Sequence, residues 1–135
     1  DLALEGLTIR LISNQPRAEL TREVTKELLA NGLIITDEAD ALLSLTLKPE
    51  QFSQRNLSLT AQARAAELEL TLASDFMLTQ ADQDPVIARA TVNRQMLNDP
   101  RNVVGKTEEL RLLREEMRRD LAAQIVRRVS YSLSD

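Results

Sequence analysis

Two runs of alternating leucines constrain the fold of this chain more than any other feature of its sequence. Leucine occupies every second position from 43 to 47, between Ser and Thr, and again from 68 to 72, between Glu and Thr. A period of two places all leucines of a run on one face of a strand. The runs therefore predict two long antiparallel strands, each with one buried and one solvated face. Pro49 cannot donate a hydrogen bond to a sheet, so it predicts an edge position, a bulge or a break after the first run.

Two helices are predicted on either side of these runs. The first lies between Pro16 and Asn31-Gly32, where apolar residues recur every four positions. The second is long. It is predicted to begin after Thr107, as its N-cap, and to end near Ser132. Its apolar stripe consists of Leu110, Leu113, Met117, Leu121, Ile125 and Val129.

Shorter alternating patterns add further strands at residues 7–11 and 86–93, and residues 33–35 predict a short strand or an extended lead-in. The order is thus strand, helix, several strands, helix. Two amphipathic helices can bury both stripes against one face of a sheet. We therefore expect an α+β fold, a two-layer sandwich with two helices on one face of a roughly four-stranded mixed sheet, in a single domain spanning residues 1–135.

The residue types that are missing exclude most kinds of catalysis. The 135 residues include no cysteine and no histidine, so the usual zinc ligands, cysteine nucleophiles and the commonest general base are all absent. The three glycines are not spaced as a phosphate-binding loop requires. We predict that the chain is not an enzyme, and we predict no catalytic residue, no metal site and no cofactor.

Nucleic acid is also a poor candidate for a partner. The second predicted helix is rich in arginine, but glutamates and aspartates are interleaved at spacings of three and four residues, which is typical of a solvated helix surface. The chain has only three aromatic residues with which to stack bases.

Binding of a phosphate-bearing polyanion remains as a candidate function. Basic residues stand where loops are expected to project: Arg55 and Arg64 around the middle hairpin, and Arg101 and Lys106 before the last helix. Two such loops could hold phosphates through charge-assisted hydrogen bonds. Taken singly, each cation is more often an ordinary solvated loop charge.

Four segments of the sequence, taken in their order, resemble a known protein family. The resemblance covers nearly the whole chain, from about residue 6 to residue 133. The segments are residues 20–32 (LTREVTKELLANG), residues 66–72 (AELELTL), Asn98-Asp99-Pro100 followed by Lys106 and Glu108-Glu109, and residues 114–128 (REEMRRDLAAQIVRR). In their order and spacing they resemble the LPS-assembly lipoprotein family LptE, also called RlpB, of Gram-negative bacteria.

The resemblance implies a non-enzymatic subunit of the outer-membrane lipopolysaccharide translocon, lipid-anchored on the periplasmic side of the outer membrane. Members plug the LptD β-barrel and bind lipopolysaccharide during its assembly into the outer leaflet. Lys106 matches the family's lipopolysaccharide-binding basic residue in the loop after Asn-Asp-Pro. A second basic position of the family falls nearest Ala61, with Arg64 three residues away. The alternative is a periplasmic protein–protein adaptor that binds no lipid.

The sequence departs from the family pattern at three points. The lipobox cysteine that would carry the acyl chains is absent, so the membrane anchor is implied by the resemblance alone. The chain begins at Asp1 without a basic or apolar leader, and we expect a processed form whose targeting segment has been removed. Ala63 and Leu68 stand where the family has a hairpin glycine and an aromatic residue, which affects the expected role of the hairpin.

Overall fold

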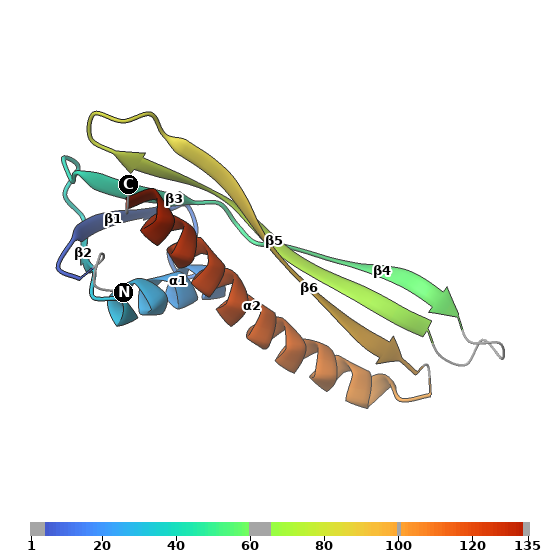
Figure 1. Cartoon of the computed structure of the whole chain (residues 1–135). Coiled ribbons are helices and arrows are strands. Elements are labelled where there is room, and N and C mark those ends of the chain that lie inside the picture. Colours follow the sequence, from blue (N-terminus) through green and yellow to red (C-terminus); the bar gives the residue numbers. More distant parts are fainter. Residues whose placement is uncertain (1–4, 60–65, 100, 134–135) are drawn as a thin grey trace.

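The computed structural model describes residues 5–59, 66–99 and 101–133 (Figure 1). Its elements follow in the order β1 (Thr8–Ser13), α1 (Glu19–Ala30), β2 (Ile34–Thr36), β3 (Leu43–Leu47), β4 (Gln51–Leu59), β5 (Ala66–Gln80), β6 (Val86–Asn98) and α2 (Val103–Leu133). The predicted α+β class, with two helices on one face of a mixed sheet, is confirmed.

The strand β5 organises the sheet. Along one edge it pairs with β6 over almost its whole length, from Ala66 opposite Asn98 to Leu78 opposite Val86. Along the other edge β3 and β4 follow one another, β3 opposite residues 76–80 and β4 opposite residues 66–73. β1 lies parallel to β3 on its outer side, and β2 lies parallel to β1. Among the described residues the sheet has six strands rather than about four, because residues 34–36 pair with β1 and the break at Pro49 divides one edge into two strands.

Both helices cover the same face of the sheet, and α2 runs along β5 and β6 (Figure 1). Part of the molecule extends well beyond α1 and β1–β3. We call it the distal arm: β4, residues 66–73 of β5, residues 91–98 of β6 and the first half of α2. The alternating leucines face the helices, as predicted, and all six are buried, as are Met117, Leu121, Ile125 and Val129 of the α2 stripe. Each fully buried leucine contributes about 2 kcal/mol to folding.

The end of α1 fits the predicted stop at Asn31-Gly32. Gly32 has a φ of +86°, and its N–H donates to the carbonyl of Leu29 while the N–H of Leu33 donates to the carbonyl of Leu28. These two bonds form a Schellman motif, which satisfies carbonyl groups that the helix leaves open. A Cβ atom at position 32 would also lie 3.0 Å from the Cα of Glu5. Both the backbone conformation and the available space therefore require glycine here.

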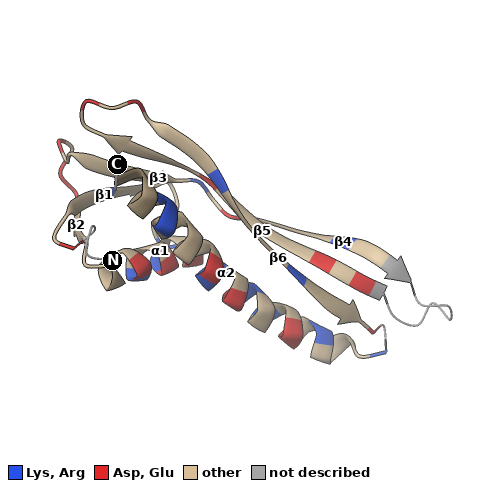
Figure 2. Ribbon diagram, viewed as in Figure 1, with Lys and Arg blue, Asp and Glu red and all other residues tan. Residues whose placement is uncertain are grey.

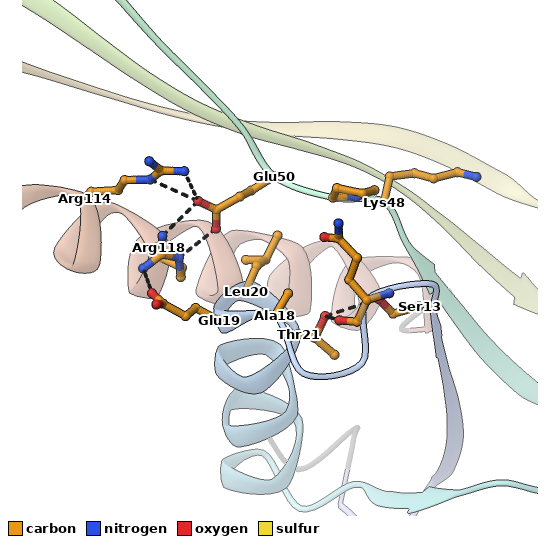
Figure 3. A pocket seen from close by; sticks show the side chains of 11 residues that line it. Ser13, Ala18, Glu19, Leu20, Thr21, Lys48, Glu50, Arg114 and Arg118 are labelled. Carbon is orange, nitrogen blue, oxygen red and sulfur yellow. Dashed lines mark hydrogen bonds and ion pairs between the residues drawn. The ribbon is translucent and has the colours of Figure 1, made fainter. Parts of the chain in front are cut away.

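A charged cluster holds the bend between β3 and β4 against the helices (Figure 3). The carboxylate of Glu50 accepts hydrogen bonds from Arg114 at 2.9 Å and from Arg118 at 2.7 Å, and Arg118 also pairs with Glu19. We call these four residues the Glu50 cluster. It joins the sheet edge to both helices, although its members are up to 99 positions apart in the chain.

The cluster corrects one expectation. Arginines of the last helix were expected to form intrahelical pairs on a solvated surface, and Arg111 does pair with Glu108 and Glu115. For Arg118 that expectation is wrong, because its side chain is only 9% exposed and turns toward Glu50. Burial by itself raises the pKa of Glu50, but the hydrogen bonds and positive charges of Arg118 and Arg114 outweigh it and lower the pKa below its ordinary value.

We predict that Gly32→Ala lowers the free energy of unfolding by about 1–2 kcal/mol, the usual cost of a left-handed conformation in a residue with a Cβ atom. Urea unfolding followed by circular dichroism measures this. Ala30→Gly, in the last turn of the same helix, is the control for a general loss of helix propensity. Equal stability of Gly32→Ala and the wild type would contradict the role of the Schellman motif.

We predict that Glu50→Gln lowers the free energy of unfolding at pH 7 by about 2–4 kcal/mol, because Arg118 stays buried with a weakened partner. The pKa of Glu50 is lower in the folded chain than its ordinary value of 4.5, so its contribution is complete above pH 4.5 and is lost as the pH falls through the folded pKa. The stability difference between wild type and variant should therefore narrow at pH 3.

Denaturant titrations at pH 7 and pH 3 check this prediction. Glu109→Gln removes the same charge from an exposed position of α2 and should leave stability nearly unchanged. A difference between wild type and Glu50→Gln that is the same at both pH values would show that the charge of Glu50 does not stabilise the fold.

Candidate functional site

The candidate site is the tip of the distal arm, where β4 and β6 end and β5 begins. β4 ends at Leu59 and β5 begins at Ala66, and Ala66 pairs with both Leu59 and Asn98, the last residue of β6. The turn from β6 to α2 follows at once. The ends of β4 and β6 and the start of α2 therefore lie at the same end of the molecule (Figure 1), and the described cations Arg55, Arg101 and Lys106 belong to the distal arm.

Lys106 lies within α2 rather than in a loop before it. The helix begins at Val103, five residues earlier than predicted, and Thr107 is not its N-cap. Instead the side chain of Asn102 accepts a hydrogen bond from the N–H of Gly105 at 3.1 Å, and the hydroxyl of Thr107 donates to the carbonyl of Val103. Asn is among the preferred capping residues. Lys106 is thereby fixed on the first turn, half-buried.

Lys106 differs from the other cations of the tip in its charge environment. No carboxylate among the described residues lies within ion-pair distance of its ammonium group. Figure 2 shows basic residues in the turn before α2 and at its start, and acidic residues further along the helix. A lysine ammonium that is not already neutralised can meet an external phosphate without breaking an internal pair.

Arg101 is held by its own turn. Its guanidinium donates to Asp99 at 3.2 Å, and its backbone N–H donates to the same carboxylate at 2.9 Å. The side-chain hydrogen bond from Arg101, followed by the backbone bond, lowers the pKa of Asp99 below its ordinary value. Asp99 therefore stays ionised and competes with any other anion for Arg101.

Arg55 lies on β4 and points away from the helices. It pairs with Glu69 of β5 at 2.8 Å, and Glu69 alternates with Leu68 and Leu70, whose side chains are buried under α2. Arg55 is thus on the opposite face of the sheet from α2, where Lys106 lies. Arg64 lies outside the described residues.

Two exposed valines also lie at the start of α2 and were not identified from the sequence as part of a site. Val103 and Val104 are 68% and 85% exposed, and Leu97 at the end of β6 is 60% exposed. Val103 and Val104 are neighbours on the first turn of α2 and give it an exposed apolar surface next to Lys106, whereas Leu97, opposite Glu67, belongs to the other face of the sheet. The signal in the sequence is the Val-Val pair, which is β-branched and not part of the helix stripe.

The cavity at the Glu50 cluster is a weaker candidate. It encloses about 220 Å³ between α1, α2 and the bend at Pro49 (Figure 3). Its arginines are already bonded to Glu50 and Glu19, so an entering anion would have to displace a carboxylate. The described residues include no group of three or more acidic side chains suited to a metal ion, and neither α1 nor α2 carries a stretch apolar enough to cross a membrane.

Known proteins with similar sequences and structures agree on one family. The profile of the LptE family, described as lipopolysaccharide-assembly, matches residues 4–129. The LPS-assembly lipoprotein LptE of Photorhabdus laumondii is 25% identical over 122 residues, which are 90% of this chain and 67% of that protein. The LptE of Yersinia pestis strain Pestoides F is 28% identical over 121 residues, and there the match spans 88% of this chain but only 58% of the relative.

The fold agrees as well. The crystal structure of the rare lipoprotein B from Shewanella oneidensis superposes with a TM-score of 0.86 at 29% identity, covering 93% of this chain and 95% of that one. The family profile covers far more than half of the chain, and the structural match extends over nearly all of it. The resemblance found in the sequence is thus confirmed, and the chain belongs to the LptE family of lipopolysaccharide-assembly lipoproteins.

Proposed function

We propose that this chain is a non-enzymatic subunit of the outer-membrane lipopolysaccharide translocon, which plugs the LptD β-barrel and binds lipopolysaccharide during its assembly into the outer leaflet. Membership of a family with a role in lipopolysaccharide assembly supports this proposal. The observation that carries the binding role is the position of Lys106, an ammonium without a carboxylate partner among the described residues, on the same helical turn as two exposed valines.

Lipopolysaccharide has the matching chemistry, because its lipid A part combines phosphate groups with acyl chains. Lys106 would bind a phosphate, while Val103 and Val104 offer apolar surface beside it. Neighbouring lipopolysaccharide molecules are bridged by divalent cations, and a protein ammonium can compete with such a cation for the phosphate. Arg55, Arg64 and Arg101 are proposed as further contacts. Arg55 and Arg101 must first exchange Glu69 and Asp99 for the ligand, so they contribute less than Lys106.

The remaining parts of the proposal follow from the family. Its members are named lipoproteins, and we propose a lipid anchor in the outer membrane, on the periplasmic side. The rival is a periplasmic adaptor that binds a protein partner and no lipid. The two differ in whether lipopolysaccharide binds and in whether a barrel is the partner.

We predict that Lys106→Asp weakens binding of lipopolysaccharide about tenfold or more, because a favourable charge-assisted bond is replaced by repulsion. Titration of purified lipopolysaccharide against the labelled protein measures the dissociation constant. Lys26→Asp on α1 changes the net charge equally at an exposed site outside the distal arm, and should change the affinity less than twofold. Equal affinities of Lys106→Asp and wild type would remove Lys106 from the site.

We also predict that the cognate LptD barrel copurifies with a tagged form of this chain when the two are coexpressed. Lys106→Asp should copurify the same amount of barrel, because the tip contacts lipid in this proposal. Purification of the tagged chain without a barrel would favour the adaptor, and loss of the barrel in Lys106→Asp alone would move that residue from the lipid site to the barrel interface.

A further inference from the structure

Half of one sheet edge has no strand beside it. β3 and β4 follow one another along β5, but β1 covers only β3, pairing with residues 44–47. After Ser13 the chain leaves the sheet and turns into α1. The place beside β4, in line with β1, is not filled by any strand that the structure describes (Figure 1).

The direction of the backbone groups on β4 follows from the hydrogen bonds around it. The carbonyl of Asp75 accepts a hydrogen bond from the N–H of Lys48. The backbone N–H and C=O groups of the odd-numbered residues of β5 therefore point toward β3 and β4. Because Ser53 lies opposite Thr71, the backbone N–H and C=O groups of the odd-numbered residues of β4 point toward β5 and form the hydrogen bonds between the two strands. The N–H and C=O groups of Phe52 and Gln54 must then point outward, away from β5.

The β6 edge of the sheet differs from β4 in that two of its outward carbonyls are bonded by side chains. On β6 the outward carbonyl of Thr91 accepts a hydrogen bond from the Gln124 side chain at 3.2 Å, and that of Asn93 accepts one from Arg94 at 2.9 Å. Within the described ranges, no side chain bonds the outward groups of Phe52 or Gln54 in this manner. Unpaired edges attract further strands, so the open stretch of β4 at Phe52 and Gln54 is a candidate position for strand addition.

A cavity lies beside this edge, between β4 and α2. It is open to solvent and has a volume of about 660 Å³. Its lining combines Phe52, Thr107 and Leu110 with five charged residues, Glu19, Arg111, Arg114, Glu115 and Arg118. The guanidinium of Arg114 stacks over the Phe52 ring at 4.5 Å. Arg111 is paired with Glu108 and Glu115, and Arg114 with Glu50. Because both arginines already have carboxylate partners, an anionic lipid would have to displace such a partner, whereas an uncharged side chain would not.

We propose that β4 is a strand-addition site, at which an extended segment of the partner polypeptide pairs with Phe52 and Gln54 and places alternate, uncharged side chains in the cavity beneath α2. Extended peptides are the ligands that offer backbone donors and acceptors at a two-residue spacing, and alternate side-chain pockets give such sites their specificity. This inference rests on the proposed function, because the partner is the coexpressed LptD chain. The ligand and the site differ from those of the lipopolysaccharide-binding tip.

Hydrogen–deuterium exchange resolved to single amides tests the proposal on the copurified complex. Exchange at the N–H groups of Phe52 and Gln54 should slow at least tenfold relative to the free chain. Ser53 and Arg55, which belong to the β4–β5 ladder, should be protected in both states. Thr91, whose N–H points outward on β6, should change little and controls for general shielding inside a barrel.

A substitution at Gln54 tests the proposed backbone hydrogen bond through the affinity of the complex. Gln54→Pro removes an outward N–H that the β4–β5 ladder does not use, so it should weaken the complex about tenfold while the melting temperature changes little. Gln54→Ala keeps the N–H and should bind within twofold of the wild type. If Gln54→Pro proves unstable, the exchange measurement on the wild-type complex decides.

Each result has one meaning. A complex that forms without protection at Phe52 and Gln54 overturns strand addition and leaves the proposed function intact. Failure of the complex to form overturns both. Protection that already exists in the free chain and rises with its concentration shows that a second copy occupies the edge, which also overturns the proposal.

Discussion

The backbone pairing of β5 is the interaction on which the rest of the structure depends. This strand spans 15 residues and bonds to β6 on one side and to β3 and β4 on the other. At a rise of about 3.3 Å per residue it is far longer than the usual strand of five or six residues. The distal arm exists because β5 and β6 continue past the end of β1 and α1. The tip with Lys106 is held away from the body of the molecule for the same reason.

An arm of this kind needs a hydrophobic layer along its whole length, and α2 provides it. The apolar side chains of α2 are less buried near the tip. Leu110 and Leu113 are partly exposed, whereas Met117, Leu121 and Ile125 are fully buried. The Glu50 cluster lies at the transition between these regions. Its desolvation cost is offset by bidentate hydrogen bonds from Arg118. The cluster fixes where the sheet bends and how α2 crosses it, which an apolar contact of the same size would define less sharply.

Local patterns predicted the fold well. The alternating leucines, the four-residue repeat of α1 and the stripe of α2 depend only on which face is buried, so they can be read from the sequence. The start of α2 could not, because Thr107 with two following glutamates satisfies the rules for an N-cap as well as Asn102 does. Gly105, a poor helix former, also obscured the first turn. The Asn102 side chain packs against Gly105 so closely that a Cβ atom there would lie 2.4 Å from its nitrogen.

The candidate site was predictable in part. The place of Lys106 next to the last helix followed from the predicted order of elements, and its proposed binding role from the family resemblance. That Arg55 lies on the other face of the sheet depends on which residues of β4 and β5 pair, which the sequence does not show. Pairings such as Glu50 with Arg118 join residues 68 positions apart and leave no periodic trace in the sequence. The Phe52–Arg114 contact is equally invisible, since neither residue type is unusual at its position.

Internal pairing decides which cations of this arginine-rich chain are available to a ligand. Arg55, Arg94, Arg101, Arg111, Arg114 and Arg118 all bond to carboxylates of the chain itself. An arginine that is already bonded to a carboxylate gains little by exchanging that partner for a phosphate, because one charge-assisted bond replaces another. A lysine without such a partner gains the whole interaction. The number of basic residues at the tip is therefore a poor guide to the anion binding proposed for it, which depends on those described cations, such as Lys106, that have no carboxylate partner.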